Sequence, residues 1–189
     1  MKILIVEGMA TSGKSSLINR ITELMSASQV QLFSESETHI PIMDKPHDLH
    51  IDFFKSLLTS ATQKNRELTI FDRFHITQAF RANADIAQYS DIENLLSEHE
   101  SRVVYLKVDE FAIADRVKLA TEHRDKKWGE YVSTKGSNFS EIADYYINQQ
   151  NSQLRLLAQS KLHSSVFNTT DHNYEAIAKT IFKDWYSQN

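Results

Sequence analysis

The chain contains no cysteine among its 189 residues, so it forms no disulfide, holds no thiolate zinc site and has no cysteine nucleophile. It also lacks any apolar run near the about 18 to 20 residues that a membrane-spanning helix needs. The opening segment, residues 1–7, reaches Glu7 too early for a secretory signal. We therefore expect a soluble, cytoplasmic protein with no membrane partner.

Acidic residues slightly outnumber basic ones: the chain has 25 Asp and Glu and 21 Lys and Arg, which gives a formal net charge of -4. This balance argues against a general binder of nucleic-acid backbones, so long nucleic acid is not an expected partner. Hydrophobic residues at 41% and charged residues at 24% are typical of globular proteins. With no linker, repeat or low-complexity tract, we expect one domain over residues 1–189.

Glycine is scarce: the chain has only four, at positions 8, 13, 129 and 136. The first two bracket Gly8-Met9-Ala10-Thr11-Ser12-Gly13-Lys14-Ser15, which matches the pattern G-x-x-x-x-G-K-[ST] at every fixed position. Residues 2–6 before it form a short apolar strand pattern, and residues 15–25 after it have apolar positions at helical spacing. Strand, loop and helix follow in the order that a phosphate loop (Walker A motif) requires.

In such a loop, backbone amides and the helix N-terminus surround a triphosphate, while Lys14 neutralises the outer phosphates and the Ser15 hydroxyl can bind magnesium. We therefore expect ATP and Mg²⁺ as cofactors. The alternative is an ordinary strand-turn-helix corner. The nucleotide-binding residues expected from the motif are Gly8, Met9, Ala10, Thr11, Ser12, Gly13, Lys14, Ser15 and Ser16.

The rest of the chain alternates strand and helix patterns. Strands are expected at residues 29–34, 68–71, 103–108 and 165–168, and helices at 51–61, 74–89, 91–99, from 111 onward, 140–160 and 174–185, the last capped by Asp171. This alternation predicts an α/β protein with the three-layer fold of phosphate-loop NTPases, in which a parallel sheet of about five strands is flanked by helices. Its ligand is expected at the carboxyl ends of the strands.

Other motifs narrow the class of phosphate-loop protein. The D-x-x-G and N-K-x-D elements of Ras-like GTPases are absent, and the third strand ends in Asp72-Arg73 where a mechanical ATPase more often has two acids. Glu7-Gly8, Ser34-Glu35-Ser36, Asp72-Arg73-Phe74 and the stretch 103–116 together resemble the thymidylate kinase and deoxynucleoside kinase group over nearly the whole chain. Two departures are Thr11, where many of these kinases have a third loop glycine, and a missing proline after the second strand.

The resemblance implies an ATP-dependent kinase that phosphorylates a nucleoside or a nucleoside monophosphate, and it assigns roles to individual residues. Glu35 is the expected catalytic base, with Glu37 as a competitor, and a solvated loop glutamate is the alternative. Asp72 is expected to hold magnesium together with Ser15, or else to cap a helix. Arg73 is expected to contact a phosphate or the substrate, or else to form a plain surface pair.

Residues 121–137 are dense in charge and contain two of the glycines, which is typical of a mobile lid. Arg124 in this segment is the expected transition-state cation, and Arg116 is the alternative donor and a nucleotide contact. A charged surface loop is the competing interpretation. Any of Phe53, Phe54, Phe74, Phe80 and Trp128 could stack on a base, although most aromatic residues at helical spacing belong to the core.

Two other functions are compatible with the same sequence. The acceptor could be a different small molecule, such as an antibiotic or a sugar, or the protein could be a non-catalytic nucleotide-binding switch. The sequence also leaves open which base is recognised, whether a hydroxyl or a phosphate is phosphorylated, and the oligomeric state, a homodimer included.

Overall fold

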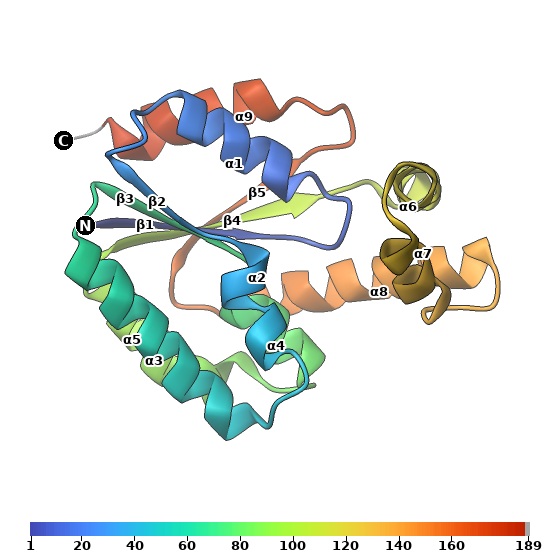
Figure 1. The fold of residues 1–189 in the computed structure, drawn as a ribbon, viewed down its shortest axis with the longest axis horizontal. Helices are drawn as coiled ribbons and strands as arrows, with labels where there is room; N and C mark the ends of the chain where they lie inside the picture. Colours follow the sequence, from blue (N-terminus) through green and yellow to red (C-terminus); the bar gives the residue numbers. More distant parts are fainter. Residues whose placement is uncertain (188–189) are drawn as a thin grey trace.

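A computed structural model describes residues 1–187. Its centre is a five-stranded sheet in the order β2-β3-β1-β4-β5, and every neighbouring pair is parallel (Figure 1). The strands are β1 (Lys2–Glu7), β2 (Val30–Phe33), β3 (Leu68–Asp72), β4 (Glu100–Lys107) and β5 (His163–Asn168). The predicted α/β fold with a parallel sheet of about five strands is thus confirmed.

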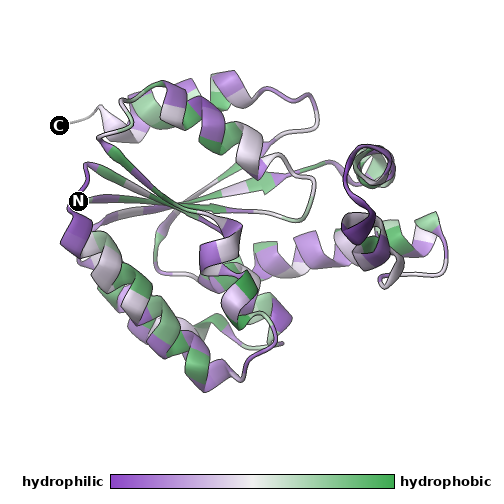
Figure 2. Ribbon diagram, in the orientation of Figure 1, coloured by the Kyte–Doolittle hydropathy of each residue, from purple (hydrophilic) through white to green (hydrophobic). Residues whose placement is uncertain are grey.

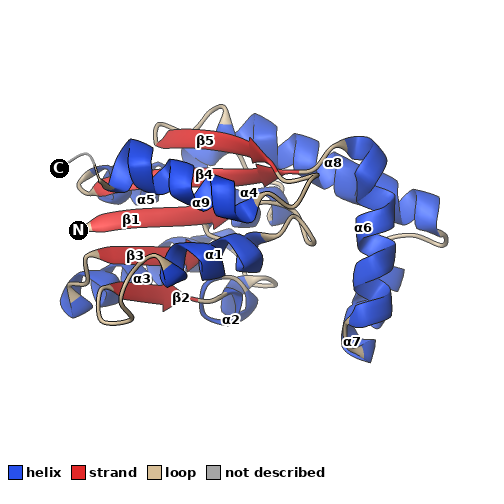
Figure 3. Cartoon of the chain, turned by 90° about the horizontal axis from the view of Figure 1, so that it is seen from above, coloured by secondary structure: helices blue, strands red, loops and turns tan. Residues whose placement is uncertain are grey.

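Helices cover both faces of the sheet, as Figure 1 shows. One face carries α1 (Lys14–Glu23) and α9 (Tyr174–Ile181), which continues as a π-helical turn over Phe182–Tyr186. The other face carries α3 (His47–Lys64), α4 (His75–Arg81), α5 (Ser90–Ser97) and α8 (Phe139–Leu157). Beyond the carboxyl ends of the strands stand α6 (Glu110–His123) and α7 (Lys126–Ser133), which Figure 3 shows from above.

The alternation of side chains along the central strand builds the two cores. Ile3 and Ile5 of β1 pack toward α3 and α5, whereas Leu4 and Val6 pack toward α1 and α9. All four are fully buried because helices cover both faces, which explains the uninterrupted apolar run in the sequence. Around the helices, hydrophobic and hydrophilic residues alternate (Figure 2), as expected where only one side meets the sheet.

Three local expectations are wrong. The helix predicted over 74–89 ends at Arg81, because Asn83 takes a left-handed conformation, and a short 3-10 helix, Ile86–Tyr89, follows. Asp171 does not cap the last helix, since His172 is also left-handed and the cap position falls to Asn173.

The third difference concerns residues 35–50, for which the sequence pattern predicts neither helix nor strand. The first part of this segment forms a helical turn, α2 (Glu35–Thr38), followed by a 3-10 turn over Ile40–Ile42. Ser34 and Glu37 close a capping box around the start of α2, which supplies partners for the free amides of this short element. None of the helices within residues 1–187 combines the length and apolar character needed to span a membrane.

Candidate active site

The phosphate loop lies between β1 and α1, and its two glycines meet different restrictions. Gly8 has φ +145°, and a Cβ there would lie 2.8 Å from the carbonyl oxygen of Leu106. Gly13 has φ +95°, and a Cβ there would lie 2.2 Å from the Tyr174 hydroxyl. Only glycine therefore fits either position, and α1 can begin at Lys14 with its free amides facing the loop.

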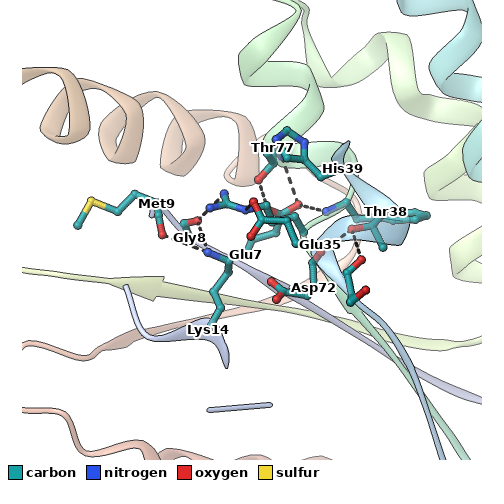
Figure 4. A network of polar contacts seen from close by, with 12 residues as sticks. Glu7, Gly8, Met9, Lys14, Glu35, Thr38, His39, Asp72 and Thr77 are labelled. Carbon is teal, nitrogen blue, oxygen red and sulfur yellow. Dashed lines mark hydrogen bonds and ion pairs between the residues drawn. The ribbon is translucent and has the colours of Figure 1, made fainter. Parts of the chain in front are cut away.

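Lys14 is folded back into the loop and is only 6% exposed. Its Nζ donates to the carbonyl oxygens of Gly8 at 3.3 Å and Met9 at 3.2 Å (Figure 4). Burial, followed by the nearby positive charge of Arg73, lowers the pKa of Lys14 to about 8. The buried ammonium group is therefore less well solvated than it would be in water. A bound anion would stabilise its charged form.

Glu35 and Arg73 form an ion pair across the carboxyl ends of β2 and β3, with 2.8 Å between Glu35 Oε1 and Arg73 Nε. Arg73 also donates to the Gly8 carbonyl at 3.1 Å and has a left-handed φ of 64°. Burial alone would raise the pKa of Glu35, but Arg73 and Lys14 hold it below its usual value, so the carboxylate is ionised. Glu37 instead accepts from the Ser34 amide at 2.9 Å and lies in the capping box.

Asp72 ends β3 and is 8% exposed. Its backbone carbonyl accepts from Thr38 Oγ1 at 2.6 Å, which joins α2 to the sheet, while its carboxylate Oδ1 is buried without a hydrogen-bond partner among residues 1–187. Burial raises the pKa of this carboxyl. Asp72 does not cap α4, whose N-cap position belongs to Phe74. An orphaned carboxylate oxygen and the exposed Ser15 hydroxyl are hard donors, so these residues suit Mg²⁺.

Glu7 connects the loop to α4 and is fully buried at the end of β1. Its carboxylate accepts from the Phe74 amide at 2.9 Å, from the Thr77 amide at 3.2 Å and from the Thr77 hydroxyl (Figure 4). Gln153 of α8 donates to the same hydroxyl at 3.2 Å. Negative charge at the first turn of α4 is favourable, so Glu7 fixes this helix against the strand.

Two cavities open at this edge of the sheet. The loop cavity, about 360 Å³, lies over the phosphate loop and is lined by residues that include Lys14, Ser15, Arg116, Arg124, His172 and Tyr174. The helix cavity, about 210 Å³, is lined by residues of α4, α7 and α8 and of the segment after β2, among them His39, Met43, Thr77, Arg81, Tyr131, Tyr146 and Gln149. Both cavities are also lined by Ala10, Glu35, Arg73 and Trp128, so they meet at the ion pair.

The two candidate transition-state cations, Arg116 and Arg124, differ in their surroundings. Arg116 of α6 is 8% exposed and donates to the backbone carbonyls of Thr11 at 3.1 Å, Thr170 at 3.1 Å and Thr169. Arg124 is exposed, and its guanidinium lies 4.4 Å from the centre of the Trp128 ring. Arg116 therefore ties the loop to the segment after β5, whereas Arg124 is free to turn toward the loop cavity that it lines.

Several cavity residues had no signal in the sequence. His39, Arg81, Tyr146 and Gln149 come from separate elements, and no fixed spacing links them. Of the aromatic residues considered for stacking, Phe54 and Phe74 belong to the core, Phe53 packs against that core, and Phe80 lines a separate surface hollow. Trp128 alone among these five lines the loop cavity and the helix cavity.

Comparison with known proteins gives matches only among solved structures: no family model and no curated protein matches the chain. The YorR protein of Bacillus subtilis, in complex with phosphorylated GDP, superposes with a TM-score of 0.65 at 17% identity, covering 96% of this chain and 94% of that one. The deoxyadenosine kinase of M. mycoides with bound dCTP gives 0.54 at 18% identity, covering 99% and 100%.

A third similar structure is polyphosphate kinase 2 of Arthrobacter aurescens TC1, with a TM-score of 0.59 at 19% identity. That match covers 94% of this chain and 64% of the other. The first two likenesses cover 96% and 99% of this chain, so they take in the parallel sheet and the helices around it. The chain therefore has the fold of the phosphate-loop kinases.

Proposed function

We propose that the protein is an ATP-dependent phosphotransferase whose acceptor is a nucleoside or a nucleoside monophosphate. The observation that carries this proposal is the meeting of the loop cavity and the helix cavity at Glu35 and Arg73. A triphosphate in one cavity and an acceptor in the other would face each other across an ionised carboxylate and a guanidinium. The nucleotides named for two similar structures, phosphorylated GDP and dCTP, support a nucleotide-type ligand.

The donor would bind in the loop cavity. Amides of the loop and of the first turn of α1 would surround the phosphates, and Lys14 would exchange its contacts with backbone carbonyls for contacts with phosphate oxygens. Ser15 and Asp72 would hold Mg²⁺, which when bound neutralises charge on the outer phosphates. His172 and Tyr174 line the same cavity and would contact the rest of the nucleotide.

The acceptor would bind in the helix cavity. A hydroxyl acceptor would lose its proton to Glu35 while its oxygen bonds to the transferred phosphorus and the bond from that phosphorus to ADP breaks. Arg73 would stabilise the negative charge of the transferring group, and Arg124 would turn from Trp128 to contribute a second cation. The same site could present a nucleoside monophosphate, whose phosphate oxygen needs no base.

The test is phosphoryl transfer from radiolabelled ATP with magnesium to a panel of nucleosides and their 5′-monophosphates, with Lys14→Ala as the matched inactive variant. Transfer to at least one member, lost in Lys14→Ala, supports the proposal. A wild-type protein that binds ATP tightly and transfers nothing to any member of the panel contradicts it.

A further inference from the structure

The helix cavity has an unused hydrogen-bond acceptor on its wall, the second ring nitrogen of His39. His39 is 6% exposed, and its Nδ1 lies 3.0 Å from Oε1 of Gln78. Because an amide oxygen only accepts, Nδ1 carries the proton, and Nε2 is left with a lone pair. Nε2 has no hydrogen-bond partner among residues 1–187, and His39 lines the cavity.

The ring of His39 is neutral. Burial, followed by the positive charges of Arg73 and Arg81, lowers its pKa to about 3. Protonation of Nε2 is therefore absent at neutral pH, and this nitrogen accepts a hydrogen bond but does not donate one. A ligand group facing it must supply the proton.

A donor lies on the same wall. Arg81 lines the helix cavity, and its Nε is buried without a hydrogen-bond partner among residues 1–187. The acid nearest to its guanidinium, Asp44, is 3.7 Å away and exposed, which is a weak pairing. Arg81 and His39 line the same cavity, and the positive charge of Arg81 contributes to the lowered pKa of His39.

We propose that the helix cavity selects acceptors with a lactam edge, in which a ring N–H lies beside a carbonyl oxygen. The N–H would donate to His39 Nε2, and the carbonyl would accept from Arg81. Uracil, thymine, hypoxanthine and guanine present this edge. Cytosine and adenine present the reverse, a ring nitrogen lone pair beside an amino group. The lone pair would face the lone pair of His39 Nε2, and the amino group would face the donor of Arg81. This inference rests on the proposed function, because it names the class of its acceptor.

The experiment compares acceptors that differ in little else: deoxyuridine with deoxycytidine, and deoxyinosine with deoxyadenosine, each as the nucleoside and as the 5′-monophosphate. With ATP and magnesium, we expect the lactam member of at least one pair to have about 10-fold to 100-fold higher kcat/KM, the range expected when mismatched polar groups are left unpaired. These measurements on the wild-type protein are already decisive. The inference is overturned if the kcat/KM ratio of the lactam member to its partner is near one in both pairs, or if the ratio is reversed.

Variants then assign the selectivity to His39. We expect His39→Phe, which keeps a ring of similar size, to reduce the ratio to about 3-fold or less with the KM for ATP unchanged. The matched control is His163→Phe, at an exposed position that begins β5 on the edge of the sheet, and it should keep the wild-type ratio. A folded His39→Phe protein with the full wild-type ratio contradicts the inference.

Calorimetric binding of the same pairs without ATP separates this inference from the proposed function. Tighter binding of the lactam member, lost in His39→Phe, with no transfer to any acceptor supports the inference and contradicts the function. Transfer to both members of each pair with equal efficiency supports the proposed function and contradicts the inference. If none of the acceptors binds, both are contradicted.

Discussion

Lys14 makes the affinity for triphosphate depend on pH. Its pKa is about 8 in the free protein, so the ammonium charge is present below that pH and is lost as the pH rises through it. A bound triphosphate favours the charged form and raises this pKa, so affinity should be constant below about pH 7 and should fall as the pH rises above about 8.

The measurement is the Kd of a non-hydrolysable ATP analogue between pH 6.5 and 9.5. Lys14→Ala should bind at least about 10-fold more weakly, with no such fall in this range and an unchanged circular dichroism spectrum. Parallel pH profiles in the two proteins would mean that another group titrates and that Lys14 does not contact the phosphates.

Substitutions at Glu35 and Glu37, which are two positions apart, should have different effects, one on catalysis and the other on stability. Glu35→Gln removes the carboxylate that lies between the cavities, so we expect kcat for a hydroxyl acceptor to fall by about 10² to 10⁴, with ATP affinity nearly unchanged. Glu37→Gln weakens the capping box of α2 and should cost at most about 1 kcal/mol of stability, with kcat intact. Steady-state kinetics and urea unfolding of both variants test this, and a loss of kcat in Glu37→Gln alone would transfer the role to Glu37.

At the scale of elements, the contacts of Arg116 and Arg124 lead to opposite expectations. Arg116→Ala leaves the carbonyls of Thr11, Thr169 and Thr170 without their donor, so it should lower stability by about 1 to 3 kcal/mol and weaken ATP binding. Arg124→Ala should leave stability within about 0.5 kcal/mol but lower kcat by about 10² to 10³, because the role proposed for this charge is to stabilise the transition state. Thermal unfolding and kinetics distinguish them, and normal kcat in Arg124→Ala would identify residues 121–137 as a structural segment.

The junction of β1 and α4 depends on Glu7. Glu7→Gln keeps the shape but removes the charge that accepts from the amides of Phe74 and Thr77, so we expect a loss of about 1.5 to 3 kcal/mol in the free energy of unfolding. Glu23→Gln, in an exposed pair with Arg20, is the control and should change stability by less than about 0.5 kcal/mol. Equal denaturation midpoints for the two variants would show that the buried carboxylate does not stabilise α4.

The elements differ in how far the sequence could predict them. The phosphate loop and the buried strands depend on local spacing, and the structure agrees with both. The break after Arg81 and the turn before α9 coincide with left-handed Asn83 and His172, and hydrophobic periodicity does not mark either position. The helix cavity could not be predicted either, because His39, Arg81 and Tyr146 meet only through tertiary packing.

For the whole molecule, the parallel sheet explains why the site residues gather. Glu7 and Asp72 are the last residues of β1 and β3, and the segment that begins with Ser34 follows β2. These three strands are neighbours in the sheet order β2-β3-β1. Residues far apart in the sequence therefore converge at one edge of the sheet, the edge beyond which α6 and α7 stand (Figure 3). This convergence explains why Lys14, Glu35 and Arg73 line the same cavity, while their roles stay predictions.

Trp128 lines both cavities, so the two ligands should influence each other through the segment that contains it. The chain has two tryptophans, and Trp185→Phe leaves Trp128 as the single fluorophore. We expect its emission to change when either an ATP analogue or the acceptor binds, and each ligand to tighten the other by about 5-fold to 150-fold, the usual range for coupled sites. Amide hydrogen exchange over residues 121–137 should slow most when both ligands are present, because only then is Trp128 covered from both sides. Equal affinities with and without the second ligand, together with unchanged exchange, would show that α6 and α7 form a fixed wall rather than a lid.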